Sequence, residues 1–301
     1  MTKPELSLQN LTVKFCHCER SEPIFLNLID TIQNMFILSG LSEAVNFLTV
    51  LKLKGKSRAL YEDSLKKSIK YFPFAGLLIG LILAAAFYVF NKFLSVQPAI
   101  LVAIFFLYII TGGLHFDGLS DTSDGFFAYL KSGDKNRFYK AMKDVNTGAA
   151  GNLAVIFYIL IMWSLISSAE PVQSFNLLNG NINFIYLALL TFPVAGRYSI
   201  VVMSYFSDTP DNFKGTGTIF TEGTDTASLI AASVFTLIII YFFLKLAGIF
   251  SLLVTVFAVL FAAFYFGRRF GGVNGDMLGF TVKLSEVVFT AALIGFHGIL
   301  Y

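Results

Sequence analysis

The chain has 301 residues, of which 56% are hydrophobic and 14% are charged, and its formal net charge is +3. Soluble globular proteins carry about 25% charged residues, so this composition excludes an ordinary soluble domain. The small positive balance argues against a nucleic-acid-binding protein, and two cysteines one residue apart exclude a disulfide framework. Because the apolar residues occur in long blocks, we predict a polytopic integral membrane protein that folds as an all-α helical bundle.

Residues 1–40 are polar and aperiodic, and they lack the basic-then-apolar pattern of a secretory signal. Cys16, His17 and Cys18 lie in this region, but their spacing is not that of a zinc site. We therefore expect a poorly ordered extension over residues 1–40 and a single membrane-embedded domain over residues 41–301.

Seven apolar stretches have, or nearly have, the roughly 20 residues that a transmembrane helix needs. We predict spans at Tyr71–Lys92, Gln97–Gly112, Gly148–Ser168, Ile182–Phe206, Ala227–Leu246, Gly248–Gly267 and Leu284–Tyr301. Ser42–Leu51 is apolar but too short to cross, so we interpret it as an interfacial or re-entrant segment.

Basic residues mark one side of the predicted bundle. They crowd alternate loops, and the remaining loops hold only Lys92 and Lys245, both at loop edges. Cytoplasmic loops carry the excess of Lys and Arg in membrane proteins. We therefore predict a multi-pass protein of the cell (inner) membrane with an active site facing the cytoplasm. The basic, cytoplasmic segments are residues 52–70, 131–143, 214 and 268–283.

Three aspartates follow the second predicted span, within the sequence GGLHFDGLSDTSDG at residues 112–125. Asp117, Asp121 and Asp124 have the spacing i, i+4, i+7, which places them on one face of a helix. Stacked carboxylates repel each other unless a cation lies among them, and oxygen ligands without a cysteine cluster favour Mg²⁺ or Mn²⁺ over zinc. The alternative is a solvated acidic loop, but unpaired acids beside a membrane span are costly and often functional. We predict that all three aspartates are catalytic and hold Mg²⁺.

Other polar residues fall on the same predicted side of the membrane. His115 is a candidate catalytic base or metal ligand, and the alternative is a hydrogen bond to Asp117. Arg197 lies inside an apolar stretch, where a cation needs a partner, and a structural ion pair is as good an explanation as a ligand role. The candidate substrate-binding residues are Lys143, Asp144, Arg197, Asn274, Asp276 and Glu286.

The motif GGLHFDGLSDTSDGF resembles the signature of the cobalamin synthase (adenosylcobinamide-GDP ribazoletransferase) family. Five further segments match this family in order, and the resemblance extends from about Ser42 to the C-terminus. These segments are Phe47-Leu48-Thr49 before a basic stretch, Tyr71-Phe72-Pro73-Phe74 with Gly76 and Gly80, Met142-Lys143-Asp144 with Gly148, Gly196-Arg197, and GGVNGDMLG before Glu286.

The resemblance implies a membrane-bound transferase that joins adenosylcobinamide-GDP to α-ribazole or its 5′-phosphate, releases GMP and requires Mg²⁺. Attack of an alcohol on a pyrophosphate needs charge neutralisation and in-line placement, which a carboxylate-held metal supplies. The expected partners are these substrates and the lipid bilayer, without nucleic acid, and the oligomeric state stays open.

Two positions depart from the pattern of the family that the chain resembles. Asn146 stands where a cation is usual, and Lys283 stands where an acid is usual. If relatives hold phosphate with the cation at position 146, this chain must either bind its nucleotide more weakly or replace that charge. The candidates for the replacement are Lys143 and Lys283.

Two other functions compete with this interpretation. Membrane phosphotransferases of the CDP-alcohol type also have an Asp-rich metal motif, but Leu119, Ser120 and Asp121 after Asp117-Gly118 do not match it. An ion-coupled transporter would place ionisable groups near the bilayer midplane. The acids of this chain cluster at span ends, which favours an enzyme.

Overall fold

The computed structural model describes residues 39–53, 61–169, 175–177, 180–210 and 215–300. These residues belong to one compact unit, Ser39–Tyr301. The predicted extension lies outside the described residues except for its last two positions, and so do Cys16, His17 and Cys18.

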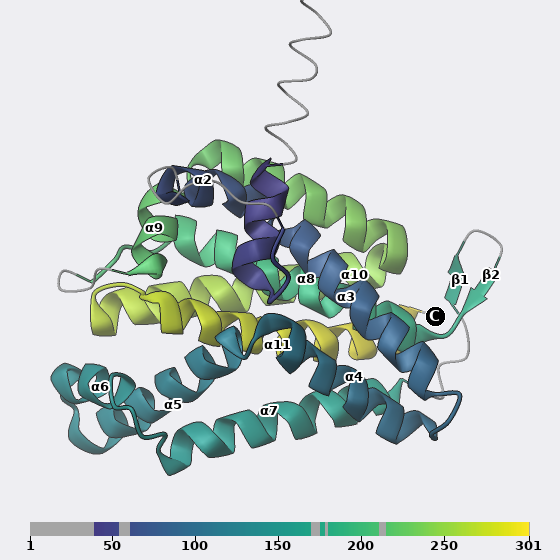
Figure 1. The fold of residues 1–301 in the computed structure, drawn as a ribbon, viewed down its shortest axis with the longest axis horizontal. Coiled ribbons are helices and arrows are strands. Elements are labelled where there is room, and N and C mark those ends of the chain that lie inside the picture. Colours follow the sequence, from purple (N-terminus) through teal and green to yellow (C-terminus); the bar gives the residue numbers. More distant parts are fainter. Residues whose placement is uncertain (1–38, 54–60, 170–174, 178–179, 211–214, 301) are drawn as a thin grey trace, which may run out of the picture. The chain divides into compact units, whose positions relative to one another are not determined.

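The unit is a bundle of helices with one short antiparallel hairpin (Figure 1). The prediction of a helical membrane bundle is confirmed, whereas the hairpin was not predicted. After a helix at residues 39–48, the elements are α2 (Tyr61–Ser68), η2 (Ile69–Tyr71), α3 (Phe72–Phe90), α4 (Val96–Thr111), α5 (Leu114–Ser132), α6 (Lys135–Met142), α7 (Ala149–Ser168), β1 (Phe175–Leu177), β2 (Gly180–Ile182), α8 (Phe184–Tyr205), α9 (Thr216–Gly223), α10 (Thr226–Phe270) and α11 (Gly275–Leu300).

Helix α8 forms the centre of the bundle. Nearly all of its residues are buried, because α3, α10 and α11 pack around it. Glycines bring α3 especially close to α8: a Cβ at Gly76 would overlap the backbone of Pro193, and one at Gly80 would overlap the backbone of Leu190. Such close backbone approach is typical of helix packing in membranes, where small residues line the contacts.

Five described helical segments are long and apolar enough to cross a membrane, or six if the bent pair α4 and α5 is one span. This measure counts α10 once, although α10 consists of two helices that meet at a kink at Lys245. With these two helices counted separately and the bent pair as one span, the described segments number seven, as predicted. Helix α4 is the short member of the bent pair: it has only 16 residues, about 24 Å of helix, and is bent by 92° from α5.

Helix α10 contains a sharp turn at Lys245, whose φ of 51° and ψ of −137° are not helical. A Cβ at Gly248 would lie 2.7 Å from the Cγ2 atom of Ile240. In a straight helix eight residues rise about 12 Å, so the chain must fold back between these positions. The turn lies beside the boundary that the sequence predicts between the two spans.

The segments that the sequence places on the basic side of the membrane contact one another. The Tyr139 hydroxyl donates to the carbonyl of Phe270 (2.8 Å), and the Val273 N–H donates to the carbonyl of Asp208 (2.8 Å). This end of the bundle lies at the left of Figure 1, with α6 and α9. The fold therefore brings the basic loops together, as the predicted topology requires.

We expect cysteines at Asn91 and Val145 to label from opposite sides of the membrane in a chain whose native Cys16 and Cys18 are serines. Asn91 follows α3, Val145 precedes α7, and both are exposed. A membrane-impermeant maleimide applied to intact cells should react with Asn91→Cys alone, and permeabilisation should add Val145→Cys. Labelling of both variants in intact cells would contradict the topology.

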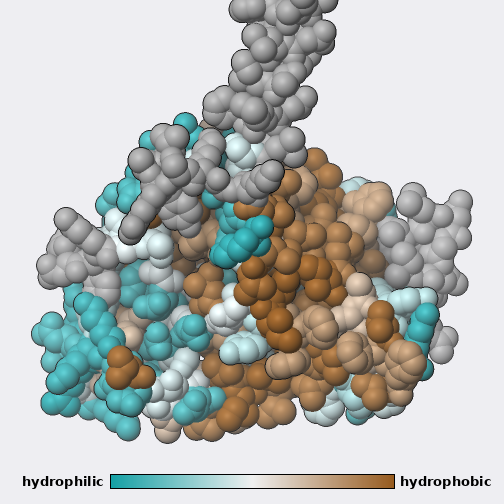
Figure 2. Space-filling view, viewed as in Figure 1, coloured by the Kyte–Doolittle hydropathy of each residue, from teal (hydrophilic) through white to brown (hydrophobic). Residues whose placement is uncertain are grey.

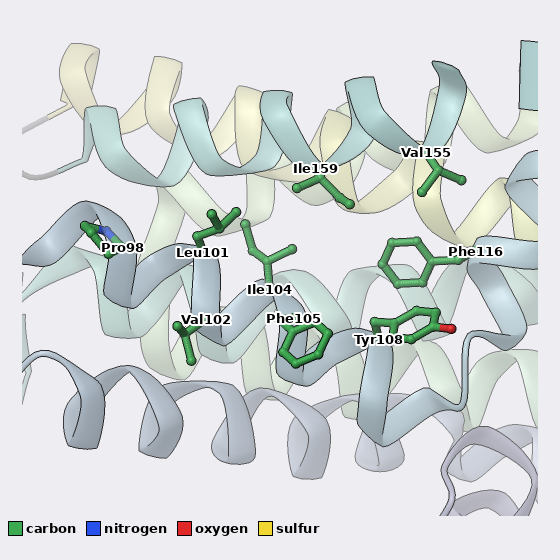
Figure 3. Close-up of a pocket in the computed structure, with 9 residues that line it drawn as sticks. All are labelled: Pro98, Leu101, Val102, Ile104, Phe105, Tyr108, Phe116, Val155 and Ile159. Atoms are coloured by element: carbon green, nitrogen blue, oxygen red, sulfur yellow. The ribbon is translucent and has the colours of Figure 1, made fainter. Parts of the chain in front are cut away.

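The surface also fits a bilayer. Hydrophobic residues cover the middle of the face shown in Figure 2, and hydrophilic residues gather at the left, over α6. Between α4 and α7 an apolar groove of about 620 Å³ is lined by residues such as Leu101, Phe105 and Ile159, with Phe116 of α5 at one end (Figure 3). Large apolar side chains are therefore exposed on the outer surfaces of α4 and α7, as contact with lipid would require.

Candidate functional site

The three aspartates of the acidic motif lie on one helix, α5, as their spacing predicts. Gly112 and Gly113, both in the left-handed conformation with φ of 58° and 77°, end α4 and let the chain turn into α5. A side chain at these positions would be strained, because only glycine adopts this conformation without cost. The turn therefore places the acidic helix directly after a membrane helix.

A fourth carboxylate joins these aspartates from α11. Helices α5 and α11 touch at glycines: a Cβ at Gly118 would lie 2.6 Å from the carbonyl oxygen of Asp276 and 2.9 Å from the Cα of Gly279. At this short separation the carboxylate of Asp121 is repelled by those of Asp276, Asp117 and Asp124. The structure thus assembles one acidic cluster from two motifs about 155 residues apart in sequence, Asp121 and Asp276.

Asp124 differs from the other members of this cluster. Its Oδ2 accepts a hydrogen bond from the Gly148 N–H (2.7 Å), and its Oδ1 accepts one from the Gly151 N–H (2.8 Å). Gly148 is the N-cap residue of α7, so Asp124 satisfies amide groups that a helix start leaves unpaired. Its metal-binding role stays a prediction, and this structure adds a role in fixing α7.

The other three carboxylates have no such partners. Within the described part of the chain, those of Asp117, Asp121 and Asp276 accept no hydrogen bond and form no ion pair. The described residues also include no ready-made group of three or more Asp, Glu, His or Cys side chains that could hold a metal ion. Unpaired, mutually repelling carboxylates nevertheless attract a divalent cation, and Mg²⁺ commonly takes one or two of them together with substrate phosphates.

His115 lies next to the acidic cluster but faces the protein interior. Its Nδ1 is 3.5 Å from Nη2 of Arg197, and its side chain is almost fully buried. With Asp276 it lines a small cavity of about 90 Å³ between α5, α9 and α11. The predicted alternative, a hydrogen bond from His115 to Asp117, is wrong, because the polar neighbour of the His115 ring is Arg197. A role of His115 as a catalytic base or metal ligand stays a prediction.

Arg197 and Glu286 form an ion pair in the centre of the bundle. Neither side chain is exposed, and Glu286 also accepts hydrogen bonds from Lys283 (3.0 Å) and from the Tyr158 hydroxyl. The Lys283 ammonium lies 3.9 Å from the ring centroid of Phe116, which adds a cation–π contact. The structural explanation for Arg197 thus has direct support, and the substrate-binding roles of Arg197 and Glu286 stay predictions.

Lys283 cannot replace a phosphate-binding cation at position 146. It is 1% exposed and binds Glu286, whereas Asn146 is exposed and donates two hydrogen bonds to Oδ1 of Asp144. The backbone and side-chain amides of Asn146 lower the pKa of the Asp144 carboxyl below its usual value. The prediction that Lys283 replaces the missing cation is therefore wrong. The same role for Lys143, an exposed residue at the end of α6, stays a prediction.

Asn274 has a structural role in addition to any contact with substrate. Its Oδ1 accepts the N–H of Met277 (3.0 Å), as an N-cap side chain does, and α11 begins at Gly275. The predicted loop at residues 268–283 is therefore helical from Gly275 onward. Asp276 consequently lies in the first turn of a helix, where the helix dipole favours a negative charge.

We expect Gly118→Ala to destabilise the protein by about 1–3 kcal/mol, the usual cost of overpacking, and to lower activity by separating Asp121 from Asp276. The measurement is turnover and resistance to SDS-induced unfolding. Gly267→Ala in α10 is the matched control, because its Cβ would meet nothing within 4 Å. Equal effects of the two variants would contradict the close contact.

Comparison with known proteins identifies the family of this chain. The family model for cobalamin-5-phosphate synthase matches residues 40–294. Adenosylcobinamide-GDP ribazoletransferase from Clostridium novyi (strain NT) is 30% identical over 79% of this chain and 89% of its own length. The enzymes of the same name from Geotalea daltonii and Fusobacterium nucleatum are 29% and 32% identical, over 85% and 76% of this chain and 96% and 87% of their own lengths. No solved structure matches the chain.

Proposed function

The chain belongs to the cobalamin-5-phosphate synthase family, and we infer that it is an adenosylcobinamide-GDP ribazoletransferase of the final step of cobalamin biosynthesis. In this reaction a hydroxyl of α-ribazole, or of its 5′-phosphate, attacks the phosphorus attached to cobinamide. A new P–O bond forms, the pyrophosphate P–O bond breaks, and GMP leaves. The family match leaves no support for a CDP-alcohol phosphotransferase or a transporter.

The acidic cluster is the observation that supports this chemistry best. Asp117, Asp121 and Asp276 present carboxylates that no described side chain neutralises. We propose that Asp117 and Asp121, with Asp276 beside them, would hold Mg²⁺ against the substrate pyrophosphate. The metal would supply charge neutralisation for the phosphoryl group and the departing GMP.

The remaining residues of the site would support this arrangement from outside it. Asp124 holds the start of α7 against α5 through Gly148 and Gly151. His115 lines the cavity beside Asp276, where it could contact substrate. Lys143 and Asp144 lie on the exposed segment between α6 and α7. A nucleotide that enters the site from water would contact them there.

We also propose that this end of the bundle faces the cytoplasm. The basic segments at residues 61–70, 131–143 and 268–270 lie there, and cytoplasmic loops carry such an excess. Both substrates are water-soluble at their reacting ends, so a site at the cytoplasmic interface would reach them directly.

The test is release of GMP by the purified, full-length protein in phospholipid vesicles with adenosylcobinamide-GDP and α-ribazole. GMP should appear only with both substrates and Mg²⁺, and chelation followed by return of Mg²⁺ should abolish and restore it. Replacing α-ribazole by its 5′-phosphate identifies the preferred acceptor. GMP release at full rate in the chelated protein would contradict the metal proposal while leaving the transferase assignment intact.

A further inference from the structure

A second cavity lies beside α5, on the side of α7. It has a volume of about 700 Å³ and is bounded by α5, α6 and α7, which meet at the lower left of Figure 1. Its lining includes the apolar side chains of Phe127, Leu153 and Phe157 and the cations Lys131 and Arg137. It is separate from the smaller cavity of His115 and Asp276, which lies between α5, α9 and α11.

The two cations are available to a ligand. Lys131 lies in the last turn of α5 and Arg137 lies on α6. Both are exposed, and neither forms an ion pair with any described residue. Asp124 also lines the cavity, but both of its oxygens accept N–H groups from the start of α7. The end of the cavity that contains Lys131 and Arg137 therefore carries positive charge that can bind an anion.

The apolar side of the cavity opens toward lipid. Phe127, Leu153 and Phe157 are 53%, 51% and 57% exposed. Leu153 and Phe157 belong to α7, a candidate membrane span of which only 22% is buried inside the bundle. In a bilayer these side chains would contact acyl chains, and the cations would lie at the level of the headgroups.

We propose that this cavity binds an anionic phospholipid, with the headgroup phosphate against Lys131 and Arg137 and an acyl chain along Phe127, Leu153 and Phe157. A water-soluble phosphate would use the cations and leave the apolar half of the cavity empty. A zwitterionic lipid would fill the apolar half but gain less from two cations. By contrast, the groove between α4 and α7 (Figure 3) is lined by apolar residues alone, so it offers no charge with which to select a headgroup.

The experiment is native mass spectrometry of the full-length protein in detergent, titrated with phosphatidylglycerol or phosphatidylcholine. We expect Lys131→Gln/Arg137→Gln to weaken phosphatidylglycerol binding about thirty-fold, which is about 2 kcal/mol at 1.4 kcal/mol per tenfold change. The matched control is Lys135→Gln/Lys140→Gln, which removes two exposed cations of α6 that do not line the cavity, and it should change binding less than three-fold.

A second pair of variants tests the apolar half. Leu153→Trp would fill the cavity and should abolish phosphatidylglycerol binding, whereas Leu160→Trp, also exposed on α7 but outside the lining, should not. This pair leaves all charges in place, so it tests the site even if the double glutamine variant folds poorly.

Three results would overturn the proposal. The first is equal binding of phosphatidylcholine and phosphatidylglycerol. The second is displacement of the lipid by millimolar glycerol 3-phosphate, which would identify a site for a soluble phosphate. The third is an unchanged affinity for phosphatidylglycerol in Lys131→Gln/Arg137→Gln together with a raised KM for adenosylcobinamide-GDP, which would assign the cavity to the substrate.

Discussion

Asp121→Asn should lower the rate of GMP release roughly a hundred- to a thousand-fold, the usual scale for removing one charge-stabilising group from an active site. The amide keeps the shape of the side chain but removes the charge that opposes a bound cation. Because Asp121 forms no hydrogen bond to the described residues, its loss should leave the bundle intact. The measurement is turnover as a function of Mg²⁺ concentration, and the half-saturating concentration should rise.

Asp134→Asn is the matched control for this substitution. Asp134 caps α6 through the N–H of Asn136, and asparagine caps helices as well as aspartate does. The control removes one negative charge near the same end of the bundle and should leave turnover within about two-fold. Near-normal activity in Asp121→Asn would remove the metal role from the acidic cluster.

Asp124→Asn should differ from Asp121→Asn in its effect on stability. An amide offers one acceptor oxygen, so only one of the N–H groups of Gly148 and Gly151 would keep its partner. A lost cap costs about 1 kcal/mol. We therefore expect Asp124→Asn, but not Asp121→Asn, to lower the resistance of the protein to unfolding. Any loss of activity would come in addition.

Glu286→Gln should cause the largest loss of stability of any substitution considered, about 3–5 kcal/mol, the usual cost of breaking a buried ion pair. Among the described residues, Glu286 is the one carboxylate that forms ion pairs with both Arg197 and Lys283, and all three side chains are fully buried. Its removal would leave two cations in the bundle without a counter-charge. The measurement is the SDS concentration that unfolds half of the purified protein.

Lys283→Met provides the contrast to Glu286→Gln. Without Lys283, the pair of Arg197 and Glu286 is electrically balanced, and a methionine can still pack on the Phe116 ring. We expect a change of at most about 1 kcal/mol, and we expect Glu286→Gln/Lys283→Met to be more stable than Glu286→Gln. If Lys283→Met were as damaging as Glu286→Gln, the balance of charges would not explain the network.

The features that the sequence predicts correctly depend on local patterns. Apolar length identifies α3, α7 and α8 almost to the residue, because hydrophobic length alone decides whether a helix spans lipid. The spacing of Asp117, Asp121 and Asp124 likewise depends only on helical periodicity. At α4 and α10 the sequence also predicts where a span ends, but the angle of the backbone bend at that point does not follow from composition.

The features that escape prediction are contacts between distant segments. The position of Asp276 beside Asp121 depends on the contact of Gly118 with Gly279, and no pattern within either motif specifies which glycine meets which. Tyr158 gives no signal, since a tyrosine in an apolar span is unremarkable until its hydroxyl meets Glu286. For Lys283 a signal exists, since a cation three residues before Glu286 has the spacing of a helical ion pair.

The glycine contact between α5 and α11 also bears on how the enzyme tolerates different membranes. Transmembrane helices tilt when the hydrocarbon layer becomes thinner or thicker. Where two backbones touch without intervening side chains, as at Gly118 and Asp276, we expect that point to be the pivot of such a tilt. The carboxylates next to a pivot change their separation far less than groups at the opposite ends of the same helices. The acidic cluster should therefore keep its spacing, and the enzyme its turnover, across bilayers of different thickness.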